Sequence, residues 1–169
     1  RGDRAELIAY YRRRLKSRAD DLNTMLALAA ALQQSGDDEE AMALLTTIVE
    51  RSPEKDEAQW QLIQLQAEQG NFNLAIEQSR AFIVDHPRDV EAIRRLAKLE
   101  VQAAIAEEDS SLFATAGETF RKMASVRADD PALALTSAQA CGAAARQAEL
   151  YAAEKPLFEV AESLYREAV

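Results

Sequence analysis

The amino-acid sequence predicts an all-α protein, built as a right-handed superhelical solenoid of antiparallel helix pairs. The helix formers Ala, Leu, Glu, Gln and Arg dominate the 169 residues, whereas Gly and Pro number only five and four. No segment alternates Val, Ile and Thr between tight turns in the manner of a β-hairpin. The most informative observation is an internal repeat of 34 residues, a spacing typical of stacked helical hairpins. The recurring pairs are Leu28 and Leu62, Gly36 and Gly70, Ala41 and Ala75, and Pro53 and Pro87.

The first element expected is a helix over residues 5–18. Leu7, Ile8, Tyr11 and Leu15 are spaced so that they fall on one stripe of it. A helix of this kind, placed before the first full repeat, is the second helix of a partial one.

Residues 22–53 predict the first full hairpin. Gly36 ends its first helix and Pro53 stops its second. We expect Asp37 to cap the second helix, with Glu40 three residues later completing a capping box. The inner face of the pair is expected to carry Met25, Leu28, Ala29, Leu32, Ala41, Leu44, Leu45 and Ile48.

Residues 56–87 predict the second hairpin, which turns at Gly70 and Asn71. Asp89 then caps a helix that is expected to run to about Glu108, and Asp109 caps its partner. The inner residues of these helices are expected to be Leu62, Ile63, Leu65, Phe72, Ala75, Ile76, Phe82, Ile83, Ile93, Leu96, Ala97, Leu99, Leu112, Phe113, Ala116, Phe120 and Met123.

The C-terminal half repeats at a longer spacing of 45 residues. Leu112 and Phe113 recur as Leu157 and Phe158, and Ala116 recurs as Ala161. The two later hairpins are therefore expected to be lengthened by about two helical turns each, which keeps the same faces inward. Asp130 and Pro131 open the fourth hairpin, and Pro156 is placed in the first turn of its last helix.

These elements predict a single domain over residues 1–169, with about four repeats and about nine helices, those after Asp89 being the longer ones. The predicted parts are the second helix of a partial repeat at 1–19, repeat one at 20–53, repeat two at 54–88, a lengthened repeat three at 89–129, and a lengthened repeat four at 130–169, with its truncation left open. Leu164 and Tyr165 would then have no following repeat to cover them. We therefore expect either a longer parent protein or association through an end.

The motifs resemble the tetratricopeptide repeat. The matching residues are Leu28, Ala29, Gly36, Ala41, Leu45 and Pro53, then Leu62, Gly70, Phe72, Ala75 and Pro87, and finally Ala161, Tyr165 and Ala168. The sequence departs from the pattern at Gln59, beside Trp60, and at Gln66 and Glu100, which take places that are usually apolar. The resemblance implies a protein-binding module. The family's chaperone-clamping Lys and Asn are replaced here by Leu26 and Ala30, so that function is not carried over.

Net charge and composition exclude several classes of partner. The net charge of −9 argues against a general nucleic-acid or anionic-membrane surface. Residues 1–18 carry seven cationic side chains against two acidic ones, for which a solvated face is favoured over an acidic partner. The longest apolar run, Met25–Leu32, is too short to insert in a membrane. A cytoplasmic location is weakly favoured, with periplasmic and other extracytoplasmic sites left open because the chain can be a fragment.

The sequence offers no catalytic constellation. His86 is the only histidine and is expected to be an exposed loop residue, while the single cysteine, Cys141, is expected to be buried packing. The acidic run from Asp37 to Glu40 lacks the ligand spacing of a calcium loop. No nucleotide-binding, nucleophile-elbow or zinc-protease motif occurs. We expect no enzyme activity, no metal and no cofactor.

The candidate binding surface is the groove that the first helices line in the resembled fold. Trp60 and Gln64 lie four residues apart, and Arg94 and Lys98 take the equivalent places one repeat later. The full predicted set is Leu26, Ala30, Gln33, Trp60, Gln64, Arg94 and Lys98. The opposing interpretation is that Trp60 fills the core in place of Gln59 and that the basic pair is merely solvated.

Two functions follow from these alternatives. The first is a non-catalytic module that binds a peptide or partner helix, with acidic groups, in its concave groove. The second is a structural solenoid segment of a larger scaffold, which binds mainly along its own stack. An accessible Trp60 favours the first function.

Overall fold

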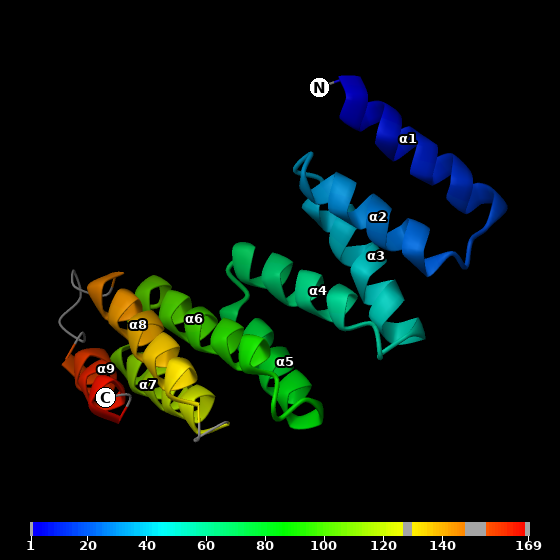
Figure 1. Cartoon of the computed structure of the whole chain (residues 1–169). Coiled ribbons are helices and arrows are strands. Elements are labelled where there is room, and N and C mark those ends of the chain that lie inside the picture. Colours follow the sequence, from blue (N-terminus) through cyan, green and yellow to red (C-terminus); the bar gives the residue numbers. More distant parts are fainter. Residues whose placement is uncertain (1, 127–129, 148–154, 168–169) are drawn as a thin grey trace. The chain divides into compact units, whose positions relative to one another are not determined.

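Every regular element of the computed structural model is an α-helix over the residues that the structure describes, which are 2–126, 130–147 and 155–167 (Figure 1). The all-α prediction is confirmed, and the helical-repeat class with it. In chain order the helices are α1 (Gly2–Ser17), α2 (Leu22–Gln33), α3 (Asp38–Arg51), α4 (Asp56–Glu68), α5 (Phe72–Asp85), α6 (Val90–Ala106), α7 (Ser110–Ser125), α8 (Pro131–Gln147) and α9 (Lys155–Glu167).

The helices fall into two units, which are considered separately. The N-terminal unit, Arg1–Asn71, holds α1 to α4, and the C-terminal unit, Phe72–Val169, holds α5 to α9. In each unit a helix packs mainly against the next one along the chain, and α7 also packs against α9. This nearest-neighbour packing is typical of repeat proteins. The single domain and its repeat boundaries remain predictions.

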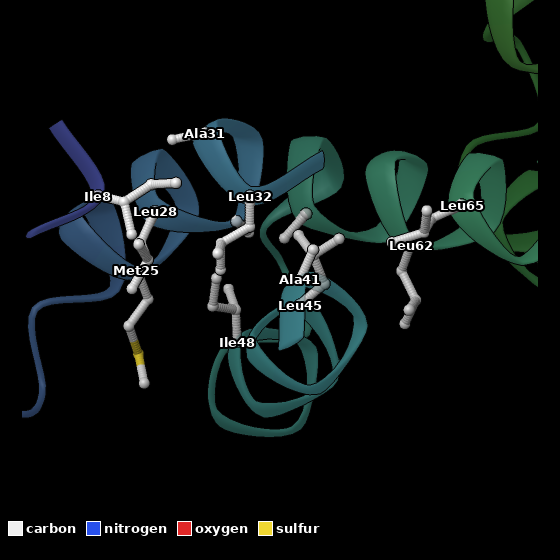
Figure 2. Packing of buried hydrophobic residues seen from close by; sticks show 12 residues of the cluster. Ile8, Met25, Leu28, Ala31, Leu32, Ala41, Leu45, Ile48, Leu62 and Leu65 are labelled. Carbon is white, nitrogen blue, oxygen red and sulfur yellow. The ribbon is translucent and has the colours of Figure 1, made fainter. Parts of the chain in front are cut away.

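The core of the N-terminal unit is the predicted apolar stripe. Its buried side chains come from all four helices and meet along one continuous cluster (Figure 2). Leu28, Leu32, Leu45 and Ile48 are at most 2% exposed. Leu7 departs from the prediction, because 43% of it is exposed while its neighbour Ile8 is buried. The inward face of α1 is therefore narrower than the sequence stripe suggests.

The predicted helix ends are largely confirmed. The carboxylate of the predicted cap Asp89 accepts the backbone N–H of Ala92 at 3.0 Å. The structure adds a further cap at Asp21, whose carboxylate accepts the backbone N–H of Thr24 at 3.1 Å. Hydrogen bonds from the hydroxyl and the backbone N–H of Thr24 hold the pKa of Asp21 at about 2. Gly36 and Gly70 end their helices with φ of 85° and 81°, a conformation that disfavours any other residue. Asp109 and Asp130 also cap their helices as expected.

The capping box predicted at Asp37 does not form. Asp37 stands at the N-terminus of α3, but its side chain makes no cap hydrogen bond. The carboxylate of Glu40 instead forms an ion pair with Arg12 of α1. The Glu40 carboxylate, which would have completed the capping box, therefore binds Arg12 of α1 instead.

The C-terminal unit buries the stripe predicted on α6 and α7. Phe113, Phe120 and Met123 are at most 1% exposed. One expectation about this unit is wrong. Leu164 of α9 is only 1% exposed, because α9 packs against both α7 and α8. The side chain of Tyr165 lies outside the described residues. The helices α6, α7 and α8 have 16 or 17 residues, whereas α9 is described over 13 and adjoins residues that the structure does not describe, so the lengthened fourth repeat stays a prediction.

Candidate functional site

The N-terminal unit carries five of the predicted groove residues. Leu26, Ala30 and Gln33 lie on α2, where each is partly buried and Leu26 packs against the core cluster. Trp60 and Gln64 lie on α4. Trp60 is partly buried, unlike the fully enclosed Leu65 of the same helix, and Gln64 is exposed. The amide of Gln64 donates to the carboxylate of Glu68 at 2.9 Å.

The C-terminal unit carries the predicted cationic pair. Arg94 and Lys98 are one turn apart on α6. Arg94 is partly buried and forms an ion pair with Glu91, whose carboxylate also accepts Arg95 at 3.1 Å. Burial is the largest single influence on Glu91 and raises its pKa, but the two arginines together lower the pKa below its usual value. Lys98 is exposed and has no ion-pair partner among the described residues.

The structure also shows a pocket that sequence reasoning did not find. It is an open cavity of about 290 Å³ in the C-terminal unit, formed by α5, α6 and α7. We call it the α5–α7 pocket. Its lining is Arg80 and Ile83 from α5, Ile93, Leu96 and Glu100 from α6, and Thr115, Glu118, Thr119 and Lys122 from α7.

A buried carboxylate organises this pocket. The side chain of Glu100 is only 1% exposed. One of its oxygens accepts the guanidinium of Arg80 at 2.8 Å, and the other accepts the hydroxyl of Thr119 at 2.6 Å. A buried charge is tolerated only when it is paired and hydrogen-bonded, and both conditions are met here. The departure at Glu100 from the apolar pattern was the sequence signal for this site.

The pocket and the predicted cationic surface use different faces of α6. Ile93, Leu96 and Glu100 follow one another at helical spacing and line the pocket. At 3.6 residues per turn, Arg94 and Lys98 project from the nearly opposite side of the same helix. The two sites can therefore be tested independently with substitutions on one element.

The prediction of burial is confirmed for Cys141 but not the prediction of exposure for His86. Cys141 is fully buried, and burial raises the pKa of its thiol to about 12, which makes it a poor nucleophile. His86 is not the exposed residue expected, because it is partly buried and stacks on Phe82 with the ring centres 4.4 Å apart. The i, i+4 spacing of these rings was visible in the sequence.

The basic residues of α1 serve largely within the N-terminal unit. Arg12 pairs with Glu40, and Arg14 pairs with Asp21 at 3.1 Å. Arg4 donates to the carbonyl of Gln34 at 2.9 Å. Three of the cations near the start of the chain are therefore already occupied by acceptors of the same unit.

Within the described part of the chain, no cluster of three or more His, Cys, Asp or Glu is arranged to hold a metal ion. The described helices also include none with the length and apolarity needed to cross a membrane.

The sequence model of the tetratricopeptide repeat family matches residues 2–81. The resemblance to this family is thus confirmed over that part of the chain. Proteins of this family are generally non-catalytic protein-interaction modules, which makes a protein the expected class of partner. No curated protein matches the chain by sequence.

Solved structures show the same fold. MamA superposes with a TM-score of 0.64 at 18% identity, over 99% of this chain and 87% of MamA. MamA from Desulfovibrio magneticus RS-1 gives 0.61 at 16% identity, over 98% and 88%. TTC0263, a thermophilic TPR protein of Thermus thermophilus, gives 0.55 at 19% identity, over 87% and 86%. At these identities the similarity establishes the fold only.

Proposed function

We propose that the chain is a non-catalytic module that binds a peptide or partner helix through the groove-facing residues of its first helices. The observation that carries this proposal is the accessibility of those residues. Gln64 and Lys98 are exposed, and Trp60 is only partly buried, while apolar neighbours on the same helices are enclosed. Each surface is proposed for its own unit: Trp60 and Gln64 in the N-terminal unit, Arg94 and Lys98 in the C-terminal unit.

The chemistry of these surfaces indicates the partner's character. A partly buried tryptophan offers a large rigid contact area at a low entropic cost, which makes it a strong anchor for an apolar side chain. On the side of α6 away from the pocket, Arg94 and Arg95 both pair with Glu91, and Lys98 is exposed. The other carboxylate of α6, Glu100, is buried and bonded to Arg80. The excess positive charge suits a partner that carries acidic groups.

We expect Trp60→Ala to weaken partner binding by about 2 kcal/mol with little change in salt dependence, because Trp is the residue type most enriched among interface hot spots.

Lys98→Glu should weaken binding and reduce its salt sensitivity, since the exposed charge that it removes is one that salt screens. Partners are captured by pull-down, identified by mass spectrometry, and their affinities are measured at low and high salt.

Arg88→Glu is the matched control, because Arg88 is also exposed in the C-terminal unit and makes the same charge change away from α6's groove face. A sharp fall in the melting temperature of Trp60→Ala with partner capture intact would identify Trp60 as a core residue. If neither variant alters capture, the alternative of a structural solenoid segment is favoured. The exposed Leu7 and Tyr10 of α1 are then the expected place of association.

A further inference from the structure

The α5–α7 pocket has a composition that its structural role does not explain. Its floor is formed by Ile83, Ile93 and Leu96, each at most 6% exposed as a residue. Its lining also includes charged side chains from α5 and α7. A pocket with an apolar base and a few converging polar groups is the usual form of a binding site.

The guanidinium of Arg80 is fixed by Glu100, and most of its N–H donors remain available to a ligand. Its side chain is 52% exposed, and its bond to Glu100 occupies one of five N–H donors. Because Glu100 is buried and also bonded to Thr119, its bond to Arg80 holds the guanidinium in a fixed position. Donors fixed in this way lose little entropy when a ligand binds, which is how preorganisation strengthens recognition.

The uncommitted charge of the pocket is positive. Both oxygens of Glu100 already accept hydrogen bonds, and the largely exposed Glu118 is paired through one oxygen with Arg121 at 2.5 Å. Lys122 is exposed and its ammonium has no ion-pair partner among the described residues. A cationic ligand would have to displace Arg80 to reach Glu100, whereas an anionic ligand meets unused donors.

We propose that the α5–α7 pocket binds an acidic side chain of a partner peptide, with Lys122 and the exposed edge of Arg80 holding the carboxylate. An apolar residue next to that acid would contact Ile83 and Leu96, since Ile93 beneath them is fully enclosed. The volume of about 290 Å³ is at the small end for a ligand pocket, which suits one or two side chains. This inference does not depend on the proposed groove, because Lys98 projects from the other side of α6.

The test uses the full chain with ¹³C-labelled Ile and Leu methyl groups and three blocked peptides as probes. The peptides are Ala-Leu-Glu-Leu-Ala and its counterparts with Gln or Lys in place of Glu. NMR titration at low salt reports binding through the methyl resonances of the pocket floor. We expect the Glu peptide to shift these resonances and to bind about tenfold more tightly than the Gln peptide, as charge-assisted hydrogen bonds require. The Lys peptide should bind weakest of the three.

Lys122→Glu is the diagnostic variant and Arg88→Glu its control, since both reverse one exposed cation in the same unit and Arg88 lines neither the pocket nor the groove. Lys122→Glu should abolish the preference for the Glu peptide, and Arg88→Glu should preserve it. Equal shifts from all three peptides, tighter binding of the Lys peptide, or equal effects of the two variants would overturn the proposal. If Lys98→Glu abolishes partner capture and Lys122→Glu does not, the result supports the proposed groove and leaves the peptide titration to decide the pocket.

Discussion

Phe120→Ala is expected to lower the free energy of unfolding by about 3–5 kcal/mol, the usual cost of emptying a buried phenylalanine site. Phe120 is 0% exposed on α7 and lies on the same buried stripe as Phe113, Ala116 and Met123. A close-packed stripe of this kind relaxes only partly around a missing ring. The measurement is urea unfolding followed by circular dichroism at 222 nm, a generic helix signal.

Leu135→Ala on α8 is the control for this prediction, because 41% of Leu135 is exposed and surface substitutions usually change stability by less than about 0.5 kcal/mol. A loss for Phe120→Ala no larger than that of Leu135→Ala would show that α7 does not form the core of the C-terminal unit.

The second large effect concerns the buried Glu100, where we expect two substitutions to change the free energy of unfolding in opposite directions. Arg80→Leu leaves Glu100 charged, buried and held by Thr119 alone, so we expect it to destabilise the protein by about 2 kcal/mol. This figure is below the roughly 3–5 kcal/mol for breaking a fully buried pair, because Arg80 is half exposed and solvent screens it. Glu100→Leu removes the buried charge itself and should leave stability unchanged or raise it by about 1 kcal/mol.

The double variant completes this cycle. With Glu100→Leu present, Arg80→Leu should cost almost nothing, because the charge that Arg80 neutralises is gone. The hydroxyl of Thr119 keeps an acceptor in the backbone carbonyl of Thr115, 3.1 Å away. Additive costs in the double variant would mean that Arg80 stabilises the unit by packing and not through Glu100. Unfolding midpoints of the four proteins in urea provide the comparison.

The features that the sequence predicted best are local ones. A helix cap such as Asp89 contacts a backbone group three residues away, and a glycine such as Gly36 is required by its own backbone angle. The 34-residue period likewise reports a hairpin that repeats its own contacts. Such signals depend on neighbours in sequence, which is why the caps at Asp89, Asp109 and Asp130 and the glycine turns were predicted correctly.

The features that the sequence did not predict depend on distant partners. Glu40 could complete a capping box, but Arg12, 28 residues away, provides a full charge. Glu100 was noticed as a departure from the repeat, yet its partners Arg80 and Thr119 lie 20 and 19 residues away on two other helices. The polar stripe of α7 has the spacing of an ordinary solvated face, so the α5–α7 pocket could not be inferred from it.

The groove residues illustrate both kinds of signal. Spacing alone placed Lys98 on an exposed face of α6 and Trp60 beside the buried stripe of α4. Spacing could not show that Arg94 forms an ion pair with Glu91, since that pairing depends on the rotamers that the two side chains adopt. Whether these residues contact a partner is a question of binding, and neither spacing nor burial decides it.

Site-specific photocrosslinking tests the central claim most directly. The photoreactive residue p-benzoylphenylalanine is placed at Gln64 on α4, at Gln102 on α6 one turn beyond Lys98, or at Thr46 on α3, all three of which are exposed. We predict that positions 64 and 102 each crosslink to a partner protein in cells and that position 46 does not. Crosslinking of equal yield from all three positions, or from position 46 alone, would contradict it.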